Sequence, residues 1–194
     1  LHLCHHNLET IDTKNYDSGN AKHNLLVDVC MAAKYEGDSL TSYNPIYQTI
    51  YKDYGSTICT VLARSFADIG DIVRGRDLFL GNDEEKKKRD ELDENLKKYF
   101  QQIHDDVTKV GTNAEELQKR YKKDEDGNYY QLREDWWYAN RQEVWKAITC
   151  KANGTYFRPT CNGGTSSTPN KCRCGDRDVN IVPTYFDYVP QYLR

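Results

Sequence analysis

Residues 82–111 read NDEEKKKRDELDENLKKYFQQIHDDVTKVG, and this stretch decides the fold class. Its apolar residues are spaced 4, 3, 4, 4 and 3 positions apart: Leu92, Leu96, Tyr99, Ile103, Val107 and Val110. This spacing places them on one face of an α-helix. Asn82 suits the N-cap, the acids after it suit the positive end of the helix dipole, and Gly111 ends the pattern. The stretch therefore predicts a long amphipathic helix with one buried face.

The preceding sequence predicts two more helices. The first covers residues 21–36, and we expect Gly37 to end it. The second is expected to begin at Asn44-Pro45, because asparagine caps helices well and proline suits the first helical position. Its apolar residues recur every three or four positions to about Ala67, with Gly55 as a weak point in the middle.

A further helix is predicted over residues 129–152. Its buried side is expected to contain Leu132, Trp136, Trp137, Val144, Trp145 and Ile148. Residues 71–81 predict only a short helix or turn, and residues 153–183 a loop-rich region. Residues 187–194 look like the start of one more helix that is cut after a single turn, so we expect the chain to be a piece of something larger. Together these patterns predict an all-α helical bundle with long loops.

Composition narrows the functional classes. The chain has 194 residues, of which 38% are hydrophobic and 29% charged, and its 27 basic and 30 acidic residues give a net charge of −3. A general nucleic-acid binder is expected to be strongly basic, so the sequence argues against that class. No apolar run is long enough to span a membrane, and the first residues do not resemble a signal peptide, so export or anchoring signals are expected outside these residues.

Seven cysteines indicate an oxidising compartment with a few disulfides. The candidates for pairing are Cys30, Cys59, Cys150, Cys161, Cys172 and Cys174. Because seven is odd, one thiol lacks a partner within the chain, and Cys4 is our choice. We predict that Cys59 pairs with Cys150, with Cys30, Cys172 and Cys174 as competing partners. Zinc is the alternative for Cys172-Arg173-Cys174, although one intervening residue is not the usual ligand spacing.

Catalytic patterns are missing from the sequence. It contains no G-x-S-x-G, no H-E-x-x-H, no Walker A loop and no G-x-G-x-x-G. Adjacent acids such as Asp105-Asp106 are typical of a solvated helix face. We therefore expect no enzyme activity and no cofactor.

Two basic clusters are candidate polyanion sites. They consist of Lys86, Lys87, Lys88 and Arg89, and of Lys119, Arg120, Lys122 and Lys123. Such clusters bind sulfated polysaccharides through charge and counterion release. Acidic residues flank both clusters, which is equally typical of an ordinary solvated helix surface. The sequon Asn153-Gly154-Thr155 is a glycan acceptor if the chain is secreted from a glycosylating cell.

Several ordered blocks resemble one family. They read CHHNLE at 4–9, VCMAAKYEG at 29–37, ARSFADIGDIVRGRD at 63–77, LREDWW at 132–137 and PTYFDYVPQYLR at 183–194. In these blocks the chain resembles the alpha-type Duffy-binding-like domain of the malaria parasite's variant erythrocyte membrane protein.

The resemblance implies the central part of a cysteine-rich, helical adhesion domain on the surface of the infected host erythrocyte. It implies that residues 1–20 end a first subdomain, 21–182 form a helical second subdomain and 183–194 begin a third-subdomain helix. The implied partners are a host cell-surface receptor or sulfated glycan, host antibodies and a neighbouring domain of the same protein. The four cysteines between the Asp68–Asp71 and Pro190–Leu193 blocks are less typical of rosetting variants than two. The alternative role is an architectural spacer that positions a neighbouring receptor-binding domain.

Overall fold

The computed structural model describes residues 21–51, 57–78, 81–109, 113–175 and 182–194. Its helices are α2 (Ala21–Tyr51), α3 (Thr57–Arg74), α4 (Asp83–Lys109), α5 (Ala114–Arg120) and α6 (Tyr130–Ile148), followed by the 3₁₀ turns η3 (Phe186–Tyr188) and η4 (Gln191–Leu193). Among these described residues there is no β-strand, so the predicted all-α fold is confirmed. No helix in the described part is long and apolar enough to cross a membrane.

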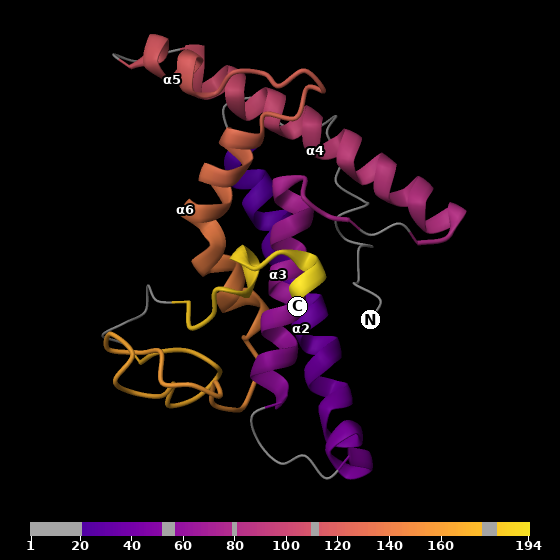
Figure 1. The fold of residues 1–194 in the computed structure, drawn as a ribbon, viewed down its shortest axis with the longest axis vertical. Helices are drawn as coiled ribbons and strands as arrows, with labels where there is room; N and C mark the ends of the chain where they lie inside the picture. Colours follow the sequence, from indigo (N-terminus) through magenta and orange to yellow (C-terminus); the bar gives the residue numbers. More distant parts are fainter. Residues whose placement is uncertain (1–20, 52–56, 79–80, 110–112, 176–181) are drawn as a thin grey trace.

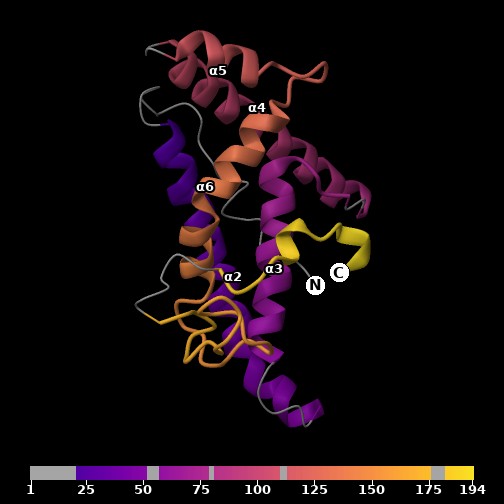
Figure 2. The same cartoon turned by 60° about the vertical axis from the view of Figure 1, so that its left-hand side comes forward.

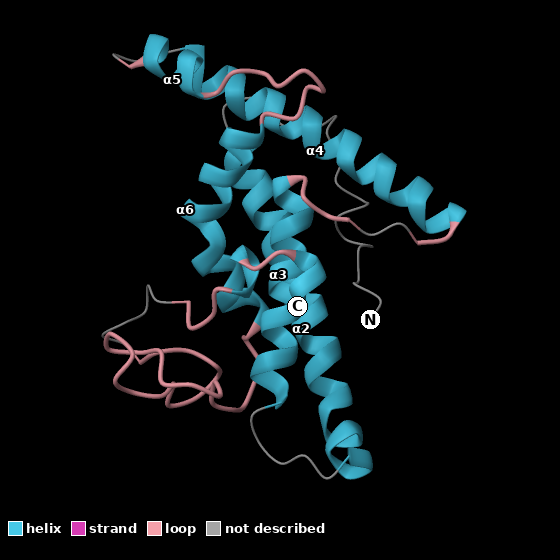
Figure 3. Cartoon of the chain, viewed as in Figure 1, coloured by secondary structure: helices cyan, strands magenta, loops and turns pink. Residues whose placement is uncertain are grey.

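Helices α2, α3 and α6 form the central bundle, and α4 lies across one end of it with α5 beside it (Figure 1). Helix α6 runs parallel to α2, since Leu26 and Trp136 line one groove near their N-terminal ends and Gly37 meets Ile148 near the end of α6. Helix α3 runs the opposite way, and the Ser65 hydroxyl donates a 3.2 Å hydrogen bond to Glu36 of α2. The extended loop after α6 lies along the other end of the bundle (Figure 3).

Aromatic rings fill the centre of the bundle. The ring of Phe66 on α3 lies 5.1 Å from that of Trp137 and 5.2 Å from that of Trp145, both on α6. All six residues predicted for the buried side of α6 are buried. Full burial of rings of this size contributes several kcal/mol each, so these contacts dominate the packing energy.

The predicted helix boundaries near Gly37 and Pro45 are wrong. Helix α2 passes through both residues and ends at Tyr51. A Cβ atom on Gly37 would lie 1.9 Å from the carbonyl oxygen of Ile148, so this glycine lets α6 approach α2 closely. That packing outweighs the cost of about 1 kcal/mol for glycine inside a helix. Asn44 and Pro45 favour a helix start locally, but α2 continues through both residues.

Helix α3 is longer than expected at its C-terminal end. It continues past Ala67 to Arg74, and Ile72 and Val73, predicted in a short helix or turn, lie in its buried last turn. Buried Arg133 of α6 donates hydrogen bonds to the carbonyls of Ile72 and Val73, at 3.0 and 2.6 Å. The Ile72 carbonyl also accepts from the N–H of Gly75, just past the helix, at 3.1 Å. Because the last carbonyls of a helix lack intrahelical donors, the α6 side chain caps the C-terminal end of α3.

The predicted start of α4 is confirmed. The Asn82 side chain accepts from the backbone N–H of Glu85 at 2.9 Å, and the Glu85 carboxylate accepts from the N–H of Asn82 at 3.0 Å. This reciprocal arrangement is a capping box. Residues 1–20 with Cys4, and also Gly55 and Gly111, lie outside the described residues.

The C-terminal segment differs from the predicted helix start. It forms η3 and η4, each a single 3₁₀ turn, rather than the first turn of an α-helix. Side-chain contacts hold it on α3 and α6: Asp187 accepts from Arg141, and Arg194 pairs with Asp68 at 3.1 Å. These contacts to the bundle, rather than hydrogen bonds along one helix, determine its path.

Candidate functional site

The two predicted basic clusters lie at different levels along α4. Lys86, Lys87 and Lys88 are exposed in the first turns of this helix. The second cluster begins in α5, and the Lys123 ammonium lies 5.9 Å from the ring of Tyr129, whose hydroxyl donates to Gln101 of α4. Lys88 and Gln101 are separated by roughly 20 Å along the helix axis, at 1.5 Å per residue. The clusters are therefore two separate patches with acidic residues between them.

The arginines in these clusters are engaged in ion pairs. Arg89 contacts Asp77 at 2.5 Å, and Arg120 donates two hydrogen bonds to one carboxylate oxygen of Asp135, at 2.9 and 2.7 Å. The six lysines, Lys86, Lys87, Lys88, Lys119, Lys122 and Lys123, are exposed. The lysines therefore carry the charge that a polyanion would meet, and the arginines hold neighbouring elements together.

A second candidate surface, the tyrosine patch, consists of Tyr138, Tyr185 and Tyr188. Their side chains are 74%, 70% and 42% exposed. The guanidinium of Arg141 lies 5.6 Å from the ring centre of Tyr185 and 5.3 Å from that of Tyr188, and Tyr138 lies one turn before Arg141 on α6. Tyrosine and arginine are enriched at the centres of protein interfaces. The patch is therefore suited to contact with another protein.

A buried ion cluster supports the tyrosine patch from below. The carboxylate of Asp187, which is 1% exposed, accepts two hydrogen bonds from Arg141 at 2.7 and 2.8 Å and one from the indole N–H of Trp137 at 3.0 Å. Arg74 of α3 donates to the backbone carbonyl of Asp187 and to the Asp71 carboxylate. Because burial penalises its charged form, the pKa of Arg74 is lowered from its usual value. The cluster fixes the segment that carries Tyr185 and Tyr188.

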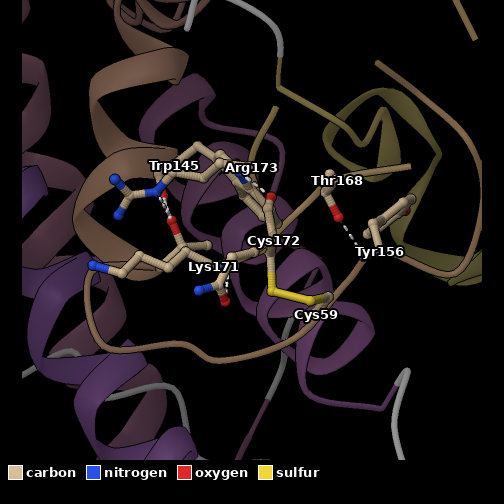
Figure 4. The surroundings of a disulfide bond; sticks show 9 residues. Cys59, Trp145, Tyr156, Thr168, Lys171, Cys172 and Arg173 are labelled. Carbon is tan, nitrogen blue, oxygen red and sulfur yellow. Dashed lines mark hydrogen bonds between the residues drawn. A yellow bond between two sulfur atoms is a disulfide. The ribbon is translucent and has the colours of Figure 1, made fainter. Parts of the chain in front are cut away.

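The disulfides correct the predicted pairing. Cys59 pairs with Cys172, and Cys161 with Cys174, so the prediction of a Cys59–Cys150 bond is wrong. Figure 4 shows the loop after α6 folding back so that Cys172 reaches Cys59 on α3. The Trp145 indole N–H donates to the Cys172 carbonyl at 3.1 Å, and the Cys172 N–H donates to Gly154. Both sulfurs of the Cys172-Arg173-Cys174 segment are in disulfides, which excludes the zinc alternative.

The two remaining described cysteines, Cys30 and Cys150, are free thiols in the α2–α6 region. The thiol of Cys150 faces Asp38 of α2, at 3.7 Å, because α6 runs alongside α2 at this level. Burial, with a smaller contribution from the charge of Glu143, raises the pKa of Cys30 to about 11. Cys30 therefore stays protonated at neutral pH.

Neither the tyrosine patch nor the Asp187 cluster was predicted from the sequence. Arg141 and Asp187 are 46 residues apart, so no local pattern joins them. One sequence feature could have indicated the patch. Three aromatic residues, Tyr185, Phe186 and Tyr188, lie close together in a segment too short to form a helix with a buried face. In the described part of the chain, no group of three or more His, Cys, Asp or Glu side chains is arranged to hold a metal ion.

Comparison with known proteins identifies relatives along the whole chain. The sequence model of the Duffy binding domain matches residues 1–194. No curated protein sequence matches. The NTS-DBL1-alpha and CIDR-gamma double domain of PfEMP1 from the Plasmodium falciparum varO strain is 41% identical with a TM-score of 0.74; it covers 99% of this chain, which spans 25% of that one.

Two single-domain structures are also similar. The NTS-DBL1(alpha-1) domain from the varO strain is 42% identical with a TM-score of 0.70, over 99% of this chain and 40% of that one. The ICAM-1-binding PfEMP1 IT4var13 DBLbeta domain is 30% identical with a TM-score of 0.71, over 100% of this chain and 39% of that one. The chain thus spans 25–40% of the length of these three solved structures.

Proposed function

This chain belongs to the Duffy-binding domain family, and from that premise we propose that it is a host-cell adhesion module of a variant surface antigen on infected erythrocytes. Related PfEMP1 domains bind host receptors, and one relative is described as ICAM-1-binding. Such a module recognises a receptor while its loops and surface charges vary between variants. We further propose that residues 21–182 form its helical second subdomain, between the end of a first and the start of a third.

The tyrosine patch is the observation that carries direct adhesion by this chain. A receptor-binding domain needs a surface of large side chains that lose water on contact. Exposed Tyr185 and Tyr188 lie against Arg141 in this way, and exposed Tyr138 lies one turn before Arg141 on α6. An architectural spacer has no such requirement. The spacer is the second candidate, because the chain spans only part of its relatives and, in that case, a neighbouring domain of the same protein carries the receptor-binding surface.

Two proteins are tested for binding to a panel of host receptors: this chain alone, and the chain joined to the neighbouring domains of the same protein, here called the intact head. The variant Y138A/Y185A/Y188A is expected to lose binding by tenfold or more, the scale of a lost hot spot. The matched control, Y35A/Y43A/F157A, removes three exposed aromatics elsewhere and should bind normally. If the intact head binds and the patch variant changes nothing, the chain is a spacer.

Sulfated glycan binding is a separate part of the proposal and rests on the exposed lysines. The variant K87E/K88E/K122E/K123E is expected to lose retention on heparin, while its thermal midpoint stays nearly unchanged because exposed charges contribute little to stability. Retention of the unmodified chain should fall steeply between about 50 and 200 mM salt, as counterion release predicts. Because the two clusters are separate, we expect this binding to be weak. Unchanged retention of the variant would eliminate these lysines as a site.

A further inference from the structure

Helix α4 crosses the end of the bundle at which α2 begins (Figure 2). An apolar groove lies there, lined by residues of α2, α4 and α6. It consists of two adjoining cavities of about 360 and 340 Å³. Both are lined by Lys22, Ile103 and Val107, so they adjoin at these residues. None of these residues belongs to the tyrosine patch or to the lysine clusters.

The lining of the groove is mostly apolar. Leu26 of α2, Ile103 and Val107 of α4, and Leu132 and Trp136 of α6 line it. Trp136 is only 6% exposed, and its indole N–H has no acceptor in the described part of the chain.

Opposite charges border the smaller cavity. Lys22 of α2 and Asp106 of α4 both line it, and neither forms an ion pair with another described residue. By contrast, Asp135, on the larger cavity, is already paired with Arg120. A partner would therefore meet one uncompensated cation from α2 and one uncompensated anion from α4.

We propose that this groove binds an amphipathic α-helix of a protein partner, with a carboxylate facing Lys22 and a basic side chain facing Asp106. A helix satisfies its own backbone hydrogen bonds and offers a ridge of apolar side chains at i, i+3 and i+7 to a groove of this kind. Strand addition has no edge to join, since the described residues contain no strand. This site is distinct from the tyrosine patch. The proposal for the groove does not depend on whether the tyrosine patch binds a receptor.

Titration of the 194-residue chain with a helical peptide tests the proposal. The probe is a peptide of about 14 residues with leucines at i, i+3 and i+7 and one Glu and one Lys beside them, and the matched probe replaces its leucines by serine. Amide chemical shifts and tryptophan fluorescence report binding. The leucine peptide should shift residues of α2, α4 and α6 around Trp136, and the serine peptide should not.

Substitutions locate the peptide. Ala139 is an exposed residue of the groove wall, so A139W fills the groove and should weaken binding about tenfold or more, whereas its neighbour variant Y138W should not. D106K should lower the affinity for the peptide several-fold, and E91K, on the same helix, should leave that affinity unchanged. Equal binding by A139W and the unmodified chain would overturn the proposal. So would binding of a small fluorescent amphiphile without the peptide, or a dimer of the chain that A139W abolishes, because each identifies a different occupant.

Discussion

At the residue scale, a few buried polar side chains determine how distant segments meet. Asp187 accepts three side-chain hydrogen bonds in a site that is closed to water. Arg133 has no exposed surface and caps the end of α3. Removing one partner from a buried polar network costs more than the network contributes, because the remaining charge stays unsolvated. Single substitutions at these positions should therefore have large effects.

The substitution D187N should destabilise the protein by about 3–5 kcal/mol, because Arg141 would stay buried without its counter-charge. Urea unfolding of the variant and of the unmodified chain measures this difference. The control is D90N, since Asp90 is an exposed acid on α4. Equal midpoints for D187N and D90N would show that Arg141 finds another partner.

Cys30 should react slowly with iodoacetamide. Its pKa is raised from 9.0 to about 11, so its thiolate fraction at pH 8 is roughly 100-fold below that of the unfolded chain. A raised thiol pKa means that the folded state holds its proton more tightly, so this group's contribution to stability is lost as pH rises from about 9 to 11. Labelling rates from pH 7 to 11, native and in urea, should show an inflection near 11 only in the native chain. If the labelling rates of the native and the urea-unfolded chain depended on pH in the same way, the raised pKa of Cys30 would be contradicted.

At the element scale, side chains three and four residues apart determine where α4 begins and which face it buries. The capping box joins Asn82 to Glu85 across a single turn. The buried face of α4 consists of Leu92, Leu96, Tyr99, Phe100, Ile103 and Thr108. The helix is otherwise strongly charged, so its stability rests on the cap and on that one face.

Replacing Asn82 by alanine should destabilise the protein by about 1 kcal/mol, because the side-chain oxygen that accepts from the Glu85 N–H is lost, while the backbone N–H of residue 82 remains. Urea unfolding measures the change. The matched control is E84A, which removes an exposed first-turn carboxylate outside the capping box. If N82A leaves stability unchanged while E84A lowers it, helix-dipole charge rather than capping stabilises this end.

At the scale of the whole molecule, the disulfide between Cys59 and Cys172 ties the helical bundle to the loop region that follows α6. These cysteines are 113 residues apart, whereas Cys161 and Cys174 are 13 apart and close only a local loop. The chain-entropy model assigns about 4.8 kcal/mol to the first bond and about 3 kcal/mol to the second. The long-range bond therefore restricts the unfolded chain much more.

The variant C59S/C172S should accordingly lose more stability than C161S/C174S, by about 2 kcal/mol in the chain-entropy model. Thermal or urea unfolding of the two double variants gives the comparison. Peptide mapping without reduction should recover one fragment joining Cys59 to Cys172. A fragment joining Cys59 to Cys150 would contradict the observed pairing.

The sequence by itself determined the features that depend on near neighbours along the chain. The start and buried face of α4, the six buried residues of α6 and the loop-rich region after it were predictable, because spacing, caps and turn residues act within one or two turns. The same local rules placed false boundaries at Gly37 and Asn44-Pro45. They could not register that Gly37 lies against the Ile148 carbonyl, since that contact joins residues more than a hundred positions apart.

Only the tertiary structure decided the disulfide partner of Cys59, the contact of Tyr185 and Tyr188 with Arg141 of α6, and the groove between α2, α4 and α6. Each of these depends on which helix runs beside which and in what direction. That choice is made by packing Trp137 and Trp145 against Phe66, a collective energy that no single local pattern in the sequence expresses.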